Sequence, residues 1–167
     1  DIGGKLAGIC NGVNTICTMI NPDMLETVGA EAPSLEWTWD DYEALCQTLI
    51  DHQSELGIDY VDDGTQMSST ETLIMAFREN GMEFYNQDGS ESFGWEKDVG
   101  KPIIVDVLNK QKEYVDKKFT APLAVRDEVT QNGVESQPMI RNVSAMAVGI
   151  WSNQILAVSN AAGHSFE

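Results

Sequence analysis

Three neighbouring carboxylates in the first third of the sequence could supply the acid and base of a hydrolase. They are Asp40, Asp41 and Glu43. Thr38 precedes them, and Thr38 with Asp41 has the spacing of a capping box at a helix start. The first turn of a helix also favours negative charge, because backbone N–H groups point toward it. We therefore interpret these carboxylates as capping residues and expect no catalytic residue in this chain.

The sequence has no convincing set of metal ligands. Asp59, Asp62 and Gly64 are spaced like part of a calcium-binding loop. With Gly64 in the sixth position of such a loop, Val61 and Thr70 would stand third and twelfth, where oxygen ligands are needed. The two histidines have no ligand-type neighbours at metal spacing, and neither a phosphate-binding glycine motif nor a nucleophile elbow is present. We expect no metal and no cofactor.

The three cysteines are Cys10, Cys17 and Cys46. They form no C-x-x-C pair, and an odd number argues against a disulfide framework. Free cysteine is one of the most frequently buried residue types. We therefore expect three thiols without a disulfide.

Tryptophan could serve a different chemistry, because an indole face stacks on the C–H face of a sugar ring. The four tryptophans include Trp37 and Trp39, which stand on either side of a helix start and are expected to anchor it. Trp151 follows an apolar strand and precedes Ser152-Asn153. Ligand sites in open α/β sheets favour strand ends of this kind. We expect Trp151 at the edge of an open concave face.

The charge balance excludes two classes of partner. The chain has 167 residues, with 10 Lys and Arg against 27 Asp and Glu, which gives a net charge of −17. Such a chain repels phosphate backbones and anionic headgroups, so we expect no nucleic-acid partner and no binding to a membrane surface. The length and the 42% of hydrophobic residues fit one folded domain.

Helix and strand signals alternate along the whole chain, which predicts an α/β layered domain. In the first part we expect strands at Leu6–Cys10 and Ile16–Ile20, a helix from Pro22 capped by Asn21 and ended by Gly29, a helix from Thr38 to near Gly57, and a strand at Ile58–Val61. Next we expect a helix that begins with a Ser68/Glu71 capping box and stops at Asn80-Gly81, and then a hairpin of Met82–Tyr85 and Ser92–Trp95. Two helices should follow, from about Asp98 to Lys118 and near Arg126–Asn132. The last expected elements are a strand at Ser144–Ile150 and a helix capped by Ser152 and closed by Gly163.

Four segments in a fixed order resemble extracellular solute-binding proteins of ABC sugar importers. Members of that family have a "DGKLYGIP" strand, a "YNK-x-LFEKAG" helix, a "P-x-TWDEF" helix and an "AAM-x-x-x-W-SNQ" segment. The corresponding segments here are Gly4–Thr15, Asn21–Gly29, Trp37–Tyr42 and Ser144–Gln154. Three departures are Cys10 in place of the usual proline, Ile20-Asn21-Pro22 in place of the usual Tyr-Asn-Lys, and the lack of an aromatic residue before Leu73–Phe77, where Ser68, Ser69 and Thr70 stand.

The resemblance implies one lobe of a periplasmic-binding-protein-like (type II) fold, with a mixed sheet flanked by helices. Residues 1–167 would be a single α/β lobe, a fragment of a two-lobe protein that captures its solute by hinge closure. The family's cleft-facing positions fall on five residues of this chain: Asn14, Thr15, Thr70, Trp151 and Asn153.

The resemblance also implies a bacterial binding protein, not an enzyme. Its solute would be a mono- or oligosaccharide that it delivers to ABC permease subunits. The parent protein would be extracellular and held at the cell surface through a lipoprotein N-terminus outside this chain, or it would be periplasmic.

Two other functions stay open on the residues alone. One is a carbohydrate-active hydrolase domain, which a turnover assay separates from a receptor that returns its ligand unchanged. The other is a protein–protein adaptor domain without a small ligand. A cleft rimmed by Asn14 and Trp151 favours the receptor, whereas a flat apolar patch there favours the adaptor.

Overall fold

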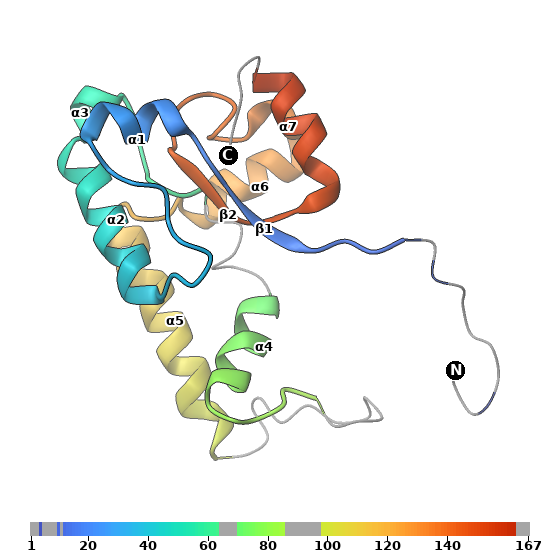
Figure 1. Cartoon of the computed structure of the whole chain (residues 1–167). Helices are drawn as coiled ribbons and strands as arrows, with labels where there is room; N and C mark the ends of the chain where they lie inside the picture. The colour runs from blue at the N-terminus through green and yellow to red at the C-terminus, as the bar shows by residue number, and fades with distance from the viewer. Residues whose placement is uncertain (1–3, 5–9, 11, 64–69, 86–97, 163–167) are drawn as a thin grey trace.

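The computed structural model describes residues 4, 10, 12–63, 70–85 and 98–162, and Figure 1 shows their arrangement. The expected strand at Leu6–Cys10 lies outside these residues except for Cys10, which is exposed and not in a strand. The Ser68 cap, the second arm of the expected hairpin at Ser92–Trp95, and Gly163 also lie outside them.

Two strands from opposite ends of the described chain form the centre of the fold. Strand β1 (Ile16–Ile20) pairs antiparallel with β2 (Met146–Trp151), and Ile16 lies opposite Trp151. The register slips once, because Cys17 lies opposite Ile150 but Thr18 lies opposite Val148. Gly149 is therefore the extra residue of a β-bulge, and its φ of 86° is one that glycine adopts without strain.

The other edge of β2 is covered by a short parallel segment. The Met146 N–H donates to the Val61 carbonyl at 2.9 Å, and the Asp63 N–H donates to the Met146 carbonyl at 3.1 Å. On its far side Asp62 forms a parallel bridge to Thr120. The sheet is thus mixed, as expected, but its parallel part consists of isolated bridges.

The strand expected at Ile58–Val61 does not form. The N–H groups of Asp59 and Tyr60 both donate to the Val143 carbonyl, at 2.8 and 3.3 Å. A ladder requires successive partners along a strand, so a shared acceptor makes a bend instead. Regular pairing begins only at Val61.

The first two helices begin where the sequence indicates. Helix α1 (Pro22–Val28) is capped by Asn21, whose side chain accepts from the Asp23 and Met24 N–H groups, and it ends at the left-handed Gly29. Helix α2 (Trp39–Asp51) begins with the predicted capping box of Thr38 and Asp41.

The helix expected to continue to Gly57 is instead interrupted at His52. Its backbone angles of −104° and 16° are not helical, and the short helix α3 (Gln53–Leu56) follows before Gly57. The His52 N–H donates to the Leu49 carbonyl at 3.2 Å, which tightens and ends the last turn of α2. Gly57, with a φ of 69°, then ends α3 as expected.

The remaining helices flank the sheet or extend from it. They are α4 (Thr70–Glu79), α5 (Gly100–Asp116), α6 (Leu123–Asn132) and α7 (Ile155–Ala162), with 3-10 turns η2 (Val134–Ser136) and η3 (Ser152–Gln154). Figure 1 shows α4 beside the first half of α5, both reaching away from the two strands. Ser152 does not cap α7 as expected, since it lies in η3 without a capping bond.

Side chains of the two strands enter two separate apolar clusters. Met146 and Val148 pack with Tyr42, Cys46, Leu49 and Tyr114 of α2 and α5 in the larger cluster. Ala147 and Ile150 pack with Met19, Met139 and Val158 in the smaller one. Strand residues alternate between faces, and the bulge at Gly149 shifts that alternation by one residue. The sheet therefore has a core on each face.

Candidate functional site

The β1–β2 pairing brings together two of the loops that were expected to face a ligand. The Thr15 N–H donates to the Ser152 hydroxyl at 3.2 Å, and the Ser152 N–H donates to the Thr15 carbonyl at 2.9 Å. This reciprocal pair extends the ladder one step beyond Trp151. Asn14 and Asn153 stand next to the bonded residues, and both are exposed.

We call Asn14, Thr15, Trp151 and Asn153 the edge site, because they lie where the two strands end. The fifth predicted residue, Thr70, does not belong to this group. It is the exposed first residue of α4, a helix that packs on α5. The structure thus places four of the five predicted residues at one edge of the sheet.

The bulge determines which way Trp151 faces. Trp151 lies opposite Ile16, and Val148 lies opposite Thr18, so each pair shares one face of the sheet. Ile16 and Thr18 are two residues apart on β1 and lie on the same face. Trp151 is therefore on the face of Val148, and it is 38% exposed. The indole is not in the deep core, in agreement with its expected position at an open edge.

The same face carries a hollow of about 570 Å³ between the sheet, the start of α2, and α4. We call it the aromatic hollow. Its main lining side chains are Trp37, Trp39 and Tyr42, with Met75 and Glu79 from α4 and Thr18 from β1.

The aromatic residues of this hollow are held in fixed positions. Trp37 and Trp39 meet Tyr42 with ring centroids 5.9 and 5.8 Å apart, and the Trp39 indole N–H donates to Glu79 at 3.2 Å. The Tyr42 hydroxyl donates to the buried Asp62 at 3.2 Å. Burial, reinforced by the Asp62 charge, raises the pKa of Tyr42 well above its usual range, so it stays a neutral donor.

Both tryptophans were expected to anchor the helix start, and they do pack on the core. Sequence reasoning did not assign them to a hollow. The two neighbouring tryptophans were the available signal for a binding hollow. The opposite wall comes from Met75 and Glu79, more than thirty residues further along the chain, and no local sequence pattern indicates that the two walls face each other.

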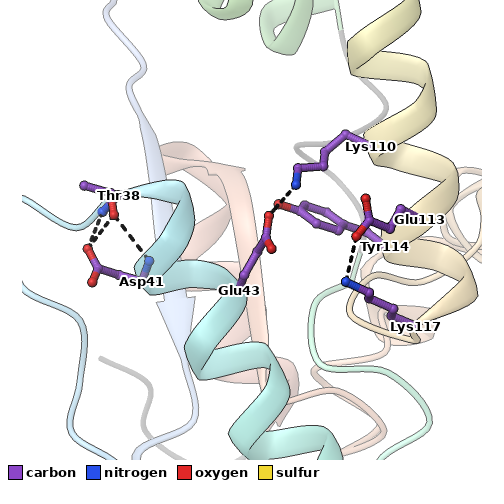
Figure 2. A network of polar contacts seen from close by, with 7 residues as sticks. All are labelled: Thr38, Asp41, Glu43, Lys110, Glu113, Tyr114 and Lys117. Atoms are coloured by element: carbon purple, nitrogen blue, oxygen red, sulfur yellow. Dashed lines mark hydrogen bonds and ion pairs between the residues drawn. The ribbon is translucent and has the colours of Figure 1, made fainter.

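A second hollow of about 310 Å³ lies on the other side of Trp39, between α2, α4 and α5. Its lining includes Glu43, and Figure 2 shows the Glu43 carboxylate reaching from α2 toward Lys110 and Tyr114 of α5. The Lys110 ammonium and the Tyr114 hydroxyl both lie 2.6 Å from the Glu43 carboxylate. These two hydrogen bonds lower the pKa of Glu43.

Two of the three carboxylates considered at first as an acid and base, Asp41 and Glu43, therefore have structural partners. Asp41 accepts from the Thr38 N–H at 2.7 Å, and this bond lowers the pKa of Asp41 (Figure 2). Glu43 joins α2 to α5 through Lys110 and Tyr114. An acid catalyst needs a raised pKa, whereas both of these pKa values are lowered.

Other candidate chemistry is sparse in the part of the chain that the structure describes. There, no group of three or more His, Cys, Asp or Glu residues is placed to hold a metal ion. Cys10, Cys17 and Cys46 are free thiols. None of the described helices is both long and apolar enough to cross a membrane.

No family model matches the sequence, but solved structures share its fold. An extracellular solute-binding protein of family 1 from Alicyclobacillus acidocaldarius matches 99% of this chain with a TM-score of 0.69 and 18% identity. An ABC substrate-binding protein from Listeria monocytogenes, in complex with cycloalternan, matches 92% with a TM-score of 0.63 and 19% identity. An ABC transporter solute-binding protein from Thermotoga lettingae, bound with alpha-D-tagatose, matches 89% with a TM-score of 0.59 and 19% identity.

The chain spans little more than a third of each of these structures: 38%, 36% and 36% of their lengths in the same order. The matched proteins are binding proteins, and at this level of identity the likeness concerns the fold. The chain therefore has the periplasmic-binding-protein-like α/β fold of one part of an extracellular solute-binding protein of ABC transporters.

Proposed function

We propose that this chain contributes one wall of a carbohydrate site in the solute-binding protein of an ABC importer. The observation that carries the proposal is the edge site: the Thr15–Ser152 hydrogen bonds hold a half-exposed tryptophan beside two exposed asparagines. Two of the structures with the same fold hold a sugar, cycloalternan in one and tagatose in the other.

The proposed roles follow from the side-chain chemistry. The Trp151 ring is the platform on which the apolar face of a sugar stacks. The Asn14 and Asn153 amides each offer a donor and an acceptor to sugar hydroxyls. The Thr15 hydroxyl donates to the Ile16 carbonyl at 3.4 Å and offers an acceptor. Thr70, which begins α4, would reach the sugar only from a second direction.

Residues 1–167 are, in this proposal, one lobe of a two-lobe receptor that closes on its solute by a hinge motion. The receptor is not an enzyme, and it hands a mono- or oligosaccharide to ABC permease subunits. It works outside the cell, either at the surface through a lipoprotein anchor or in the periplasm. A neutral sugar also suits a chain with a net charge of −17, which would repel anionic solutes.

Sugar titrations followed by NMR test the edge site in this chain. One wall leaves about half of the usual contacts unmade, so we expect dissociation constants of about 1 mM or weaker for a monosaccharide and for a cyclic or linear oligosaccharide. The Trp151 indole N–H signal should shift in the wild type, and Trp151→Ala should abolish saturation. Leu156→Ala, which removes an exposed side chain from the neighbouring helix, is the matched control.

Three results would contradict the proposal. The first is no shift of the Trp151 signal with any sugar at 50-fold excess. The second is an equal loss of binding in Trp151→Ala and Leu156→Ala. The third is release of shortened sugars during the titration, which would identify a hydrolase instead of a receptor.

A further inference from the structure

The aromatic hollow has a chemistry different from that of the edge site. We propose that it is a separate binding site for a small organic cation, of the quaternary ammonium or protonated amine class. Its volume of about 570 Å³ is within the usual range of small-molecule pockets, roughly 300–1,000 Å³. The inference does not depend on the carbohydrate proposal, because no residue of the edge site lines this hollow.

The three rings of the hollow lie in different planes. Trp37 and Trp39 are half-buried and meet the fully buried Tyr42 at interplanar angles of 66° and 84°. Rings at such angles form walls in different directions instead of one flat stack. Aromatic walls of this kind attract a cation through the negative faces of their π systems, and tryptophan is the strongest of them.

The electrostatics of the hollow also favour a positive guest. Glu79 is the one charged side chain among the described residues that line it, with no Lys or Arg among them. The Trp39 indole N–H donates to that carboxylate at 3.2 Å and so keeps it beside the rings. The chain's net charge of −17 adds a long-range attraction for cations.

A sugar would find two of the donors in this hollow already engaged. The Trp39 N–H is already bonded to Glu79, and the Thr38 hydroxyl already donates to Asp41 at 2.7 Å. Sugar hydroxyls left without partners in a half-buried site weaken binding. A quaternary ammonium ion has no hydrogen-bonding groups on its methylated head, so the lack of hydrogen-bond partners in the hollow does not weaken its binding.

The second hollow differs in its charged groups. There Glu43 is already neutralised by Lys110 at 2.6 Å, so a guest cation would have to compete with a fixed ammonium group. The two hollows share Trp39, Met75 and Glu79. The second is also lined by Asp40 and Asp106, but it holds a fixed ammonium group and lacks Trp37 and Tyr42. We therefore place the cation in the aromatic hollow, where three rings and one carboxylate line a space without a competing ammonium group.

The test compares choline with 3,3-dimethylbutan-1-ol, its neutral isostere of the same shape, in calorimetric and NMR titrations of the whole chain. We expect choline to bind about tenfold more tightly than the alcohol, because only choline has the cation–π and carboxylate attractions. The indole N–H signals of Trp37 and Trp39 should shift, and the Trp151 signal should not. Trp151→Ala should leave choline binding unchanged.

Three variants separate charge from packing. Glu79→Gln keeps an acceptor for the Trp39 N–H and should weaken choline several-fold without affecting the alcohol. Glu26→Gln makes the same charge change on α1, away from the hollow, and should have no effect. Trp37→Leu should weaken choline by a similar factor, with its unfolding curve recorded to confirm the fold.

Equal affinity for choline and the alcohol would overturn the proposal, since the hollow would then be merely apolar. Equal weakening by Glu79→Gln and Glu26→Gln would overturn it as well, because the attraction would then come from the overall charge. A neutral sugar that displaces choline and depends on Trp37 would show that the hollow is a carbohydrate subsite. Loss of sugar binding in Trp151→Ala bears only on the edge site.

Discussion

Replacing Asp62 with alanine should destabilise the fold strongly, because this buried carboxylate connects two elements of the fold. Asp62 has no exposed surface, and its two carboxylate oxygens accept from the Tyr42 hydroxyl at 3.2 Å and the Val148 N–H at 3.0 Å. The Val148 bond continues the contact between β2 and the segment 61–63. One side chain therefore joins α2 to the sheet.

The magnitude follows from the two donors. Removing the carboxylate leaves a buried hydroxyl and a buried N–H without these acceptors, and each loss costs about 1–3 kcal/mol. We expect Asp62→Ala to lower the free energy of unfolding by about 3–5 kcal/mol, a large share of the 5–15 kcal/mol typical of a domain. Asp62→Asn keeps one acceptor and should cost about 1–2 kcal/mol, similar to Tyr42→Phe.

Urea unfolding followed by circular dichroism measures these differences, with Asp59→Ala as the exposed control. The double variant of Asp62→Ala and Tyr42→Phe should lose less than the sum of the two single losses, because both remove the same bond. Unfolding free energies of Asp62→Ala and Asp59→Ala within roughly 0.5 kcal/mol of each other, about the error of extrapolation, would refute this role of Asp62. Additive losses in the double variant would refute it as well.

Three other predictions concern pH, thiol reactivity and the bulge. The pKa of Glu43 is lowered below its ordinary value of 4.5 in the folded state, so the ionised carboxylate stabilises the fold above that pH and this contribution is lost as the pH falls further. The urea midpoint should therefore fall less between pH 5 and pH 3 in Glu43→Gln than in the wild type. Cys10 is exposed and should react with a thiol reagent at once, whereas Cys46, whose pKa burial raises, should react only after unfolding; rapid labelling of Cys46 in the native protein would refute this. Gly149→Ala forces a side chain onto a φ of 86° and should cost about 1–2 kcal/mol; an unchanged thermal midpoint would argue against the bulge.

The starts of α1 and α2 and the glycines that end α1 and α3 were predictable because their determinants are local. Asn21 and Thr38 cap their helices through side-chain bonds to groups two or three residues ahead. Gly29 and Gly57 end helices by adopting a left-handed conformation. Each of these signals is complete within five residues of sequence, so no knowledge of the tertiary fold is needed.

The prediction of a strand at Ile58–Val61 was wrong because its determinants are distant in the sequence. Its apolar pattern is real, since Ile58 and Val61 are both buried in the larger cluster. Whether such a segment becomes a strand depends on the partners that its backbone meets, and here Val143 accepts from two consecutive N–H groups. Those partners lie more than eighty residues away, where no local pattern can indicate them.

The site shows the same division between local and distant information. Trp151 was singled out from its own neighbourhood, at the junction of a strand and a turn. Asn14 and Thr15, from the loop on the other side of the ladder, were named only through the family resemblance. Ser152 was expected to cap a helix, although its hydroxyl accepts from Thr15. Local patterns therefore indicated Trp151, but its position beside Asn14 and Thr15 depends on pairing over more than 130 residues.

One ladder supports both proposed sites, and its bulge links them. Without the extra residue at Gly149, the alternation of β2 would place Trp151 on the face of Ala147, against the smaller cluster. With the bulge, Trp151 shares a face with Val148 and lies beyond the aromatic hollow that Val148 helps to line. Loss of the bulge should therefore impair sugar binding at the edge site and also alter the hollow. Trp151→Ala and Glu79→Gln, by contrast, should each affect one site only, and a chain in which those two variants behaved alike would have a single site instead of two.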